Sequence, residues 1–275
     1  MERVAPQRVV LFADILGFAN LVEDIDDRHS ITSDVFAFED PPHRPDRMTF
    51  SAVFRGFHTA VEAAVNRVVR AGRDVQAIVF SDSAFVALDD ISNAASFSAY
   101  LMRDLIRARV PVRMGLGLGS FFPLRFRTDT GLRVRVHTAH FYGTAVVHAH
   151  HAESCGARGM RILLHPSLYR SHSPNSLFTS IPLPEPFGPI TKELVYLREL
   201  DEPYWPQSDL REPSSTESDP DLELYESVKE MHKWHRSHPL PVRNHYLETL
   251  QLLGRMRTSQ GLVPFEEINQ DASEA

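Results

Sequence analysis

The hydrophobic pattern of the N-terminal part of the chain predicts a buried strand followed by a long helix. Arg8–Phe12 is a nearly continuous apolar run, typical of a strand buried on both faces, and Asp14 lies where that strand should end. Within Ala52–Arg70, apolar residues recur at the spacing of one helix face, and Gly72 follows as a stop signal. The pattern therefore predicts a strand, an acidic residue at its end, and a helix.

Two shorter apolar runs predict a β-hairpin with an acidic residue in its turn. Val75–Phe80 and Ala84–Leu88 are separated only by a short polar stretch that contains Asp82. Asp82, like Asp14, should therefore lie at the end of a strand. Later runs predict a helix, a strand, a second hairpin, a helix and a strand, at Ser92–Ala108, Pro111–Gly119, Leu124–Val136, Tyr142–Ser154 and Arg161–Leu164.

This order of elements predicts an α+β fold of the ferredoxin-like kind, with helices covering one face of the sheet, over residues 1–200. Within it, residues 26–47 are acidic, contain three prolines and predict an inserted loop. Residues 201–221 are rich in proline, serine and acidic side chains, and helical periodicity returns after them. We therefore expect residues 201–275 to be a linker and a C-terminal helical extension.

Composition and charge argue against several classes of protein. The chain has 275 residues, of which 43% are hydrophobic, enough for one substantial core. Its formal net charge of −7 argues against a nucleic-acid surface, which usually carries a basic stripe. The most apolar run, Val9–Val22, is interrupted by Asp14 and is too short to cross a bilayer. With the single cysteine Cys155, no intramolecular disulfide can form, and we expect a cytoplasmic protein that binds neither nucleic acid nor membrane.

The two acidic residues at predicted strand ends suggest phosphate chemistry. Carboxylates on neighbouring strands can share two divalent cations, and two metals about 3.5–4 Å apart clamp an in-line phosphoryl displacement. Alternatively, Asp14 caps the short helix after Leu16, and Asp82 is simply a turn residue, because aspartate is common in both roles. Spacing alone favours this structural alternative.

The residues around both acids change that balance. Phe12–Phe18 (FADILGF) resembles the F-x-D-I-x-G-F segment of class III adenylate and guanylate cyclases, and Phe80–Phe85 resembles the second metal-binding hairpin of that family, with Ser81 in place of glycine. Val112–Gly119 is similar to the R-x-G-I-x-x-G strand of the family, and Tyr142–Val147 leads a helix similar to its G-x-x-V-N-x-A segment. All four segments occur in the family order.

The resemblance implies an enzyme that closes a nucleoside triphosphate into a 3′,5′-cyclic monophosphate. It implies that Asp14 and Asp82 are catalytic, and that they hold two divalent cations, Mn²⁺ or Mg²⁺, together with the carbonyl of Ile15. In this family the active site forms between two catalytic domains. Because the chain contains one such domain, the resemblance implies a homodimer.

The departures from the family point to a particular base. Val147 and His151 stand where the family has an asparagine and an arginine that assist the transition state, and Ile78 and His140 stand where adenylate cyclases read the purine. A retained metal site without purine determinants resembles the pyrimidine cyclases of bacterial Pycsar anti-phage systems. This implies UTP or CTP as substrate, with UTP preferred, and a cyclic nucleotide that a separate effector protein reads.

Further residues are candidates for substrate contacts. Phe12 and Phe50 could contact the nucleotide, Phe50 as a wall of the base pocket, although an aromatic residue before a helix is more often part of the core. Lys192 precedes a strand much as the phosphate-binding lysine of the family does, and an exposed lysine is the alternative. His151 could donate a hydrogen bond to the phosphates in place of the missing arginine, or be an ordinary surface histidine.

Three other functions stay open at this point. The chain could make cyclic CMP, it could be a purine cyclase with unusual base contacts, or it could be a catalytically weak cyclase-like domain that binds nucleotide. Retention of Asp14 and Asp82 argues against the weak domain, whereas Val147 and His151 argue for some loss of activity.

Overall fold

A computed structural model of the chain describes residues 6–19, 50–124, 140–171, 180–187, 190–196, 219–235, 240–259 and 261–265. The predicted insertion, most of the second predicted hairpin and nearly all of the predicted linker lie outside these ranges.

Six elements on the N-terminal side form two interleaved β-α-β units. They are β1 (Gln7–Ile15), α2 (Phe50–Arg70), β2 (Val75–Val79), β3 (Ser83–Leu88), α3 (Ile91–Arg107) and β4 (Val112–Ser120). Their strands lie in the order β2-β3-β1-β4, and each neighbouring pair is antiparallel. This is the split β-α-β arrangement of the ferredoxin-like fold, so the predicted fold class is confirmed.

Three further strands extend the sheet beyond β4. β7 (Ile162–Leu164) pairs with β4 in parallel, and β9 (Ile190–Leu194) and β8 (Ser180–Phe187) follow in antiparallel order. The hydrophobic pattern predicted no strand at β8, which contains three prolines. Proline lacks the N–H that a central strand needs, but it is tolerated here because β8 lies at the sheet edge with an irregular register. β5 (Phe122–Leu124) and β6 (His140–Tyr142) pair as a separate ribbon.

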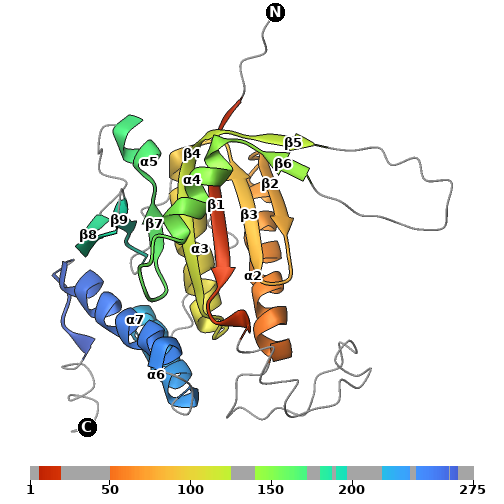
Figure 1. Ribbon diagram of the computed structural model, residues 1–275. Coiled ribbons are helices and arrows are strands. Elements are labelled where there is room, and N and C mark those ends of the chain that lie inside the picture. The colour runs from red at the N-terminus through yellow and green to blue at the C-terminus, as the bar shows by residue number, and fades with distance from the viewer. Residues whose placement is uncertain are drawn as a thin grey trace, which may run out of the picture.

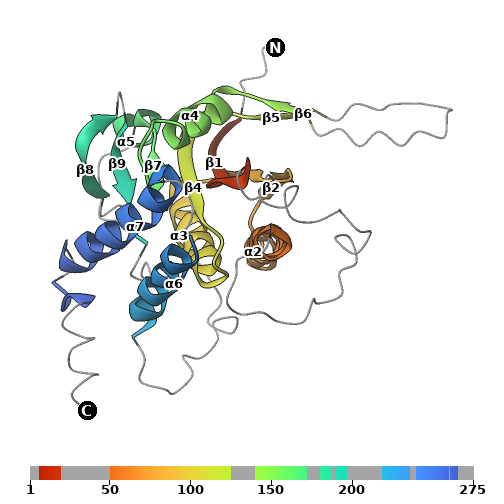
Figure 2. The same cartoon turned by 60° about the horizontal axis from the view of Figure 1, so that its bottom comes forward.

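Helices cover both faces of the sheet rather than the single face that the sequence predicted. α2 and α3 lie on one face, and α4 (Thr144–Glu153) lies on the other, above β4 and β1 in Figure 2. The side chains of β1 alternate accordingly. Val9 and Leu11 belong to the core under α2 and α3, whereas Val10 and Phe12 belong to a second cluster under α4.

α4 can approach β4 closely because the strand presents glycine to it. Gly115, Gly117 and Gly119 occupy every second position of β4 on the α4 side. A Cβ atom on Gly117 would lie 2.5 Å from the backbone nitrogen of Ala149, and one on Gly115 would lie 2.1 Å from its carbonyl oxygen. No side chain larger than hydrogen fits between this strand and this helix.

The C-terminal part of the described chain is helical, as the returning periodicity predicted. α6 (Pro220–Trp234) begins after Asp219, whose carboxylate accepts a hydrogen bond from the N–H of Asp221, and α7 (Leu240–Ser259) packs against α6. In Figure 1 both helices lie beside α3. Their buried residues join the main core, among them Leu224, Val228, Leu252 and Leu253. The predicted division of the chain after residue 200 stays a prediction.

None of the helices in the described ranges combines the length and the apolar character that a membrane crossing requires.

The glycine face of β4 yields a stability prediction. Gly117→Ala should destabilise the protein by about 1–3 kcal/mol, because the added methyl group overlaps the backbone of α4. Gly254→Ala is the matched control, since Gly254 lies within α7 with open space around its Cα and alanine is the better helix former. Urea unfolding monitored by circular dichroism measures both. Equal stabilities for Gly117→Ala and wild type would show that α4 does not lie this close to the strand.

Candidate active site at the end of the first strand

Asp14 lies at the end of β1, on the face of the sheet that α4 covers. Its neighbours Ala13 and Ile15 point into the core under α2 and α3, so strand alternation turns Asp14 to the other face, together with Phe12. Asp14 is paired in register with Ser83 of β3 on one side and with Arg113 of β4 on the other. The carboxylate is therefore held at the end of a central strand.

Asp82 lies in the turn beside this strand end. The backbone N–H of Ile15 donates to the carbonyl of Asp82 at 2.9 Å, which ties the turn to β1. The turn is closed by a 2.7 Å hydrogen bond from the N–H of Phe80 to the carbonyl of Ser83, and the hydroxyl of Ser81 donates to the Asp82 carboxylate at 3.3 Å. Because β1 and β3 are antiparallel, the end of one meets the start of the other, and this brings the two predicted acids together.

The surroundings of Asp14 are negative. Burial, and then the charges of Glu153 and Asp82, raise the pKa of Asp14 from 3.8 to about 7, while the guanidinium of Arg113 opposes the shift. The carboxyl therefore keeps its proton at pH values where an ordinary aspartate is ionised. A cation bound beside it would replace that proton.

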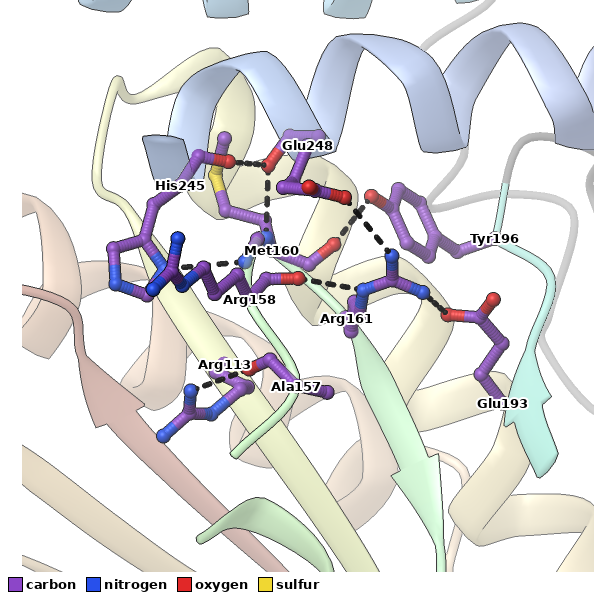
Figure 3. A network of polar contacts seen from close by, with 11 residues as sticks. Arg113, Ala157, Arg158, Met160, Arg161, Glu193, Tyr196, His245 and Glu248 are labelled. Atoms are coloured by element: carbon purple, nitrogen blue, oxygen red, sulfur yellow. Dashed lines mark hydrogen bonds and ion pairs between the residues drawn. The ribbon is translucent and has the colours of Figure 1, made fainter. Parts of the chain in front are cut away.

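An ion pair borders Asp14 on the α4 side. Arg113, which is opposite Asp14 in the register of β1 and β4, lies 2.6 Å from a carboxylate oxygen of Glu153, and that glutamate is only 4% exposed. Arg113 also donates to the carbonyl of Ala157 at 2.7 Å (Figure 3). The sequence alone did not predict this pair. Two features of the sequence could have indicated it: an arginine on the glycine face of β4 and a glutamate at the end of an alanine-rich helix. A charge buried at either position needs a partner of opposite charge.

The oxygen atoms at this strand end are a partial set of ligands for a divalent cation. Two carboxylates, of Asp14 and Asp82, and the Ile15 carbonyl are hard ligands of the kind that Mg²⁺ and Mn²⁺ prefer. Glu153 is already paired with Arg113. Within the described ranges, no group of three or more histidine, cysteine, aspartate and glutamate side chains forms a metal site of its own. Substrate phosphates and water would therefore have to complete the coordination, as is usual for Mg²⁺.

An aromatic cluster lies next to Asp14 on the same face. Phe12 stacks on Phe85 with ring centroids 4.4 Å apart, Phe85 packs against Phe141 at 4.9 Å, and Ile78 pairs with Phe85 in register. Phe12 is 7% exposed, because this cluster and α4 both cover it. Phe80, at the rim of the cluster, is 41% exposed. Of these aromatic rings, only Phe12 was predicted from the sequence to contact a nucleotide.

The other candidate residues are not gathered around Asp14 within this chain. Lys192 lies on β9, with its ammonium group 4.8 Å from the ring centroid of Tyr169, and β4 and β7 separate its strand from β1. His151 is exposed on α4. Phe50 begins α2 and His140 begins β6, but the side chains of both lie outside the described part of the structure.

The chain is similar in structure to several cyclase domains. One is the guanylyl cyclase Cya2, with a TM-score of 0.46 and 12% identity over 74% of this chain and 98% of that one. Another is a dimeric guanylyl cyclase domain of the RhoGC fusion protein from the aquatic fungus Blastocladiella emersonii. Its TM-score is 0.42, with 15% identity over 70% of this chain and 94% of that one. A third is an adenylate cyclase from Trypanosoma brucei, with a TM-score of 0.43 and 16% identity over 73% of this chain and 92% of that one.

No protein-family model matches the chain, and no curated protein sequence does either. At such low identities and TM-scores we take no residue role, substrate or assembly from the three structures.

The raised pKa of Asp14 predicts a pH-dependent stability. The folded protein holds this proton with a pKa of about 7 against an ordinary 3.8, so metal-free wild type should lose stability as the pH rises between these values and no more above pH 7. Asp14→Asn cannot ionise. Allowing for solvent screening, it should be more stable than wild type by about 1–3 kcal/mol at pH 8, and by nearly nothing at pH 4. Urea unfolding of chelator-treated protein tests this, and an advantage that is the same at both pH values contradicts it.

Proposed function

We propose that the chain is a nucleotidyl cyclase that converts UTP to 3′,5′-cyclic UMP and pyrophosphate. The observation that carries the proposal is the pairing of Asp14 and Asp82 at one strand end, within segments that resemble the two metal-binding motifs of class III cyclases. In this proposal the product is a second messenger of anti-phage defence, made in the cytoplasm and read by a separate effector protein, as the resemblance to Pycsar cyclases implies.

The residues at the strand end would share the work as follows. Asp14, Asp82 and the Ile15 carbonyl would hold two divalent cations, Mn²⁺ or Mg²⁺, which when bound acidify the ribose 3′-hydroxyl and offset the triphosphate charge. The fixed positive charge of Arg113 next to Asp14 would stabilise negative charge that develops on the phosphates. Asp14 at the end of a central strand, and Asp82 in the turn tied to that strand, would keep the reacting groups in position.

The reaction itself is a single displacement. The 3′-oxygen loses its proton and attacks the α-phosphorus, a new phosphorus–oxygen bond forms, and the bond to the β-phosphate oxygen breaks, so that pyrophosphate leaves. The protein contributes position and charge, and no covalent intermediate with a side chain is required.

The base preference rests on the apolar character of the wall beside Asp14. Ile78 lies in one cross-strand row with Phe85 and Phe12, and an aliphatic side chain offers no hydrogen bond to the edge of a purine. This supports a pyrimidine substrate, and the preference for UTP over CTP comes from the resemblance alone. A purine cyclase and a catalytically weak nucleotide-binding domain are the competing assignments, the latter favoured by exposed His151 and Val147 in place of assisting polar groups.

A homodimer is part of the proposal. Three exposed apolar side chains belong to the α4 side of the sheet: Phe80 at the rim of the aromatic cluster, Tyr142 at the end of β6, and Val147 on α4. A second copy of the chain would bury them. Lys192 is remote from Asp14 in its own chain. In a dimer, Lys192 of one copy could instead reach the Asp14 site of the other copy.

The substrate assignment predicts the outcome of a competition assay. Purified protein with Mn²⁺ and an equimolar mixture of the four nucleoside triphosphates should yield cyclic UMP as the main product, measured by chromatography and mass spectrometry. Asp14→Ala and Asp82→Ala should each abolish the product while the circular dichroism spectrum stays unchanged, because each removes a ligand rather than a core residue. Cyclic CMP, or a purine product, would correct the base; full turnover in either variant would refute the metal assignment.

The dimer predicts a second result. Phe80→Glu should shift the protein from dimer to monomer in light scattering and lower turnover in parallel, because a charge cannot be buried there without a partner. Val69→Glu is the control, since Val69 is 56% exposed on α2, on the opposite side of the sheet. If Phe80→Glu remains dimeric and active, this face is not the interface.

A further inference from the structure

Side chains of α7 hold the segment that links α4 to β7. This segment, residues 157–161, runs beneath α7 (Figure 3). The N–H of Gly159 donates to Nδ1 of His245 at 3.1 Å, and the N–H of Met160 donates to the hydroxyl of Thr249 at 2.9 Å. His245 and Thr249 are one helical turn apart, so both reach the segment from the same face of α7.

Both acceptors are fixed in the state that these hydrogen bonds require. The Thr249 hydroxyl donates its proton to the carbonyl of His245 at 2.7 Å, which leaves an oxygen lone pair for the N–H of Met160. Burial, together with the charges of Arg113 and Arg158, lowers the pKa of His245 to about 4, so its ring is neutral and Nδ1 can accept.

Two carbonyls of the segment are also held by side chains. The hydroxyl of Tyr196 donates to the carbonyl of Met160 at 2.8 Å, and Nε of Arg161 donates to the carbonyl of Arg158 at 2.6 Å. Arg161 is in turn paired with buried Glu193 at 2.7 Å. An irregular backbone in a protein interior needs such partners, and here they fix its path.

The other end of the segment reaches the candidate active site. The carbonyl of Ala157 accepts a hydrogen bond from Arg113 at 2.7 Å, and this arginine is paired with Glu153 and lies opposite Asp14. An unbroken series of contacts therefore runs from Thr249 through the segment to Arg113. The approach of α7 requires glycine at 159, where φ is +94° and a Cβ atom would lie 3.2 Å from the Thr249 hydroxyl.

We propose that α7 is part of the catalytic apparatus, and that His245 and Thr249 are positioning residues that fix Arg113 beside Asp14 through residues 157–161. This proposal rests on the proposed cyclase function, because it assigns a role in that reaction. The alternative is a purely structural role, in which α7 stabilises the fold and has no effect on the position of Arg113. The two differ in what happens to a correctly folded variant that lacks only the hydrogen bonds to the segment.

Two pairs of variants isolate those hydrogen bonds. Thr249→Val keeps the shape but removes the acceptor for Met160, whereas Thr249→Ser keeps it. His245→Leu removes the acceptor for Gly159, whereas His245→Asn can place an amide oxygen near the position of Nδ1. Thr258→Val is the matched control, because Thr258 makes the same type of bond to a carbonyl within α7, to Gly254 at 3.0 Å, on an exposed part of the helix.

Steady-state kinetics well below each variant's melting temperature provide the first readout. Thr249→Val and His245→Leu should lower kcat by about ten- to a hundredfold with a smaller change in KM, because misplacing a charged group by a fraction of an ångström to 1 Å has effects of this size. Thr249→Ser, His245→Asn and Thr258→Val should stay near wild type. A kcat for Thr249→Val that equals that of Thr258→Val overturns the proposal.

The second readout does not depend on activity. In ¹⁵N-arginine-labelled protein, the Nε–H signal of Arg113, which is bonded to Glu153 at 2.7 Å, should exchange with solvent faster in Thr249→Val than in Thr258→Val. If the wild type makes no cyclic nucleotide, the proposed function fails while this measurement still decides whether α7 positions Arg113. Equal exchange rates in the two variants overturn the inference even where the wild type is an active cyclase.

Discussion

The close contact between α4 and β4 is the constraint on which the candidate site depends. A helix normally packs on a sheet through side chains, but here the backbone of Ala149 would lie 2.5 Å from a Cβ on Gly117. At this depth the last turn of α4 brings Glu153 within 2.6 Å of Arg113. A larger residue on this face of β4 would lift the helix and move Glu153 away from Arg113. The glycines are therefore a requirement of the site as well as of the fold.

The same contact brings like charges together. Glu153 and Asp82 both act on Asp14, and Arg113 compensates only partly, since the pKa of Asp14 is still about 7. A fold selected for stability alone would not keep an acid in such a place, because each ionised neighbour makes the next more costly. A bound cation with its phosphates reverses the sign of this effect. In the proposed function this unfavourable charge would favour metal binding, which links the electrostatics of β1 to the proposed chemistry.

Local sequence patterns predicted the parts of this structure that local rules govern. The apolar run before Asp14, the helical spacing of Ala52–Arg70 and the polar turn around Asp82 each correspond to an element of the described chain. The pairing of β1 with β3 and β4 follows from the α+β order, but the register that sets Arg113 opposite Asp14 depends on tertiary packing.

The residues that sequence reasoning missed or left apart are those separated by long stretches of chain. Arg113 and Glu153 are 40 positions apart, and nothing in either neighbourhood indicates the other. Lys192 matched a family position, yet two strands separate β9 from β1, a distance that only the strand order reveals. The three prolines of β8 argued against a strand in the sequence. Proline is tolerated mainly in edge strands, and whether a strand lies at an edge is a property of the whole sheet.

The position of α7 is itself determined by buried charges. Arg257 of α7 pairs with Asp219 at 2.6 Å, and Asp221 lies between Arg257 and Arg103 of α3, at 3.8 and 3.9 Å. Burial is the main cause that raises the pKa of Asp221 to about 6. Such a network stabilises one arrangement only, because moving α7 would leave charges without partners in a medium of low polarity. Asp221 belongs to α6, so α3 holds α6 and α6 holds α7, and α7 in turn holds residues 157–161. The helical extension is therefore linked by contacts to the strand end that carries Asp14, and a displacement of α7 should change the position of Arg113.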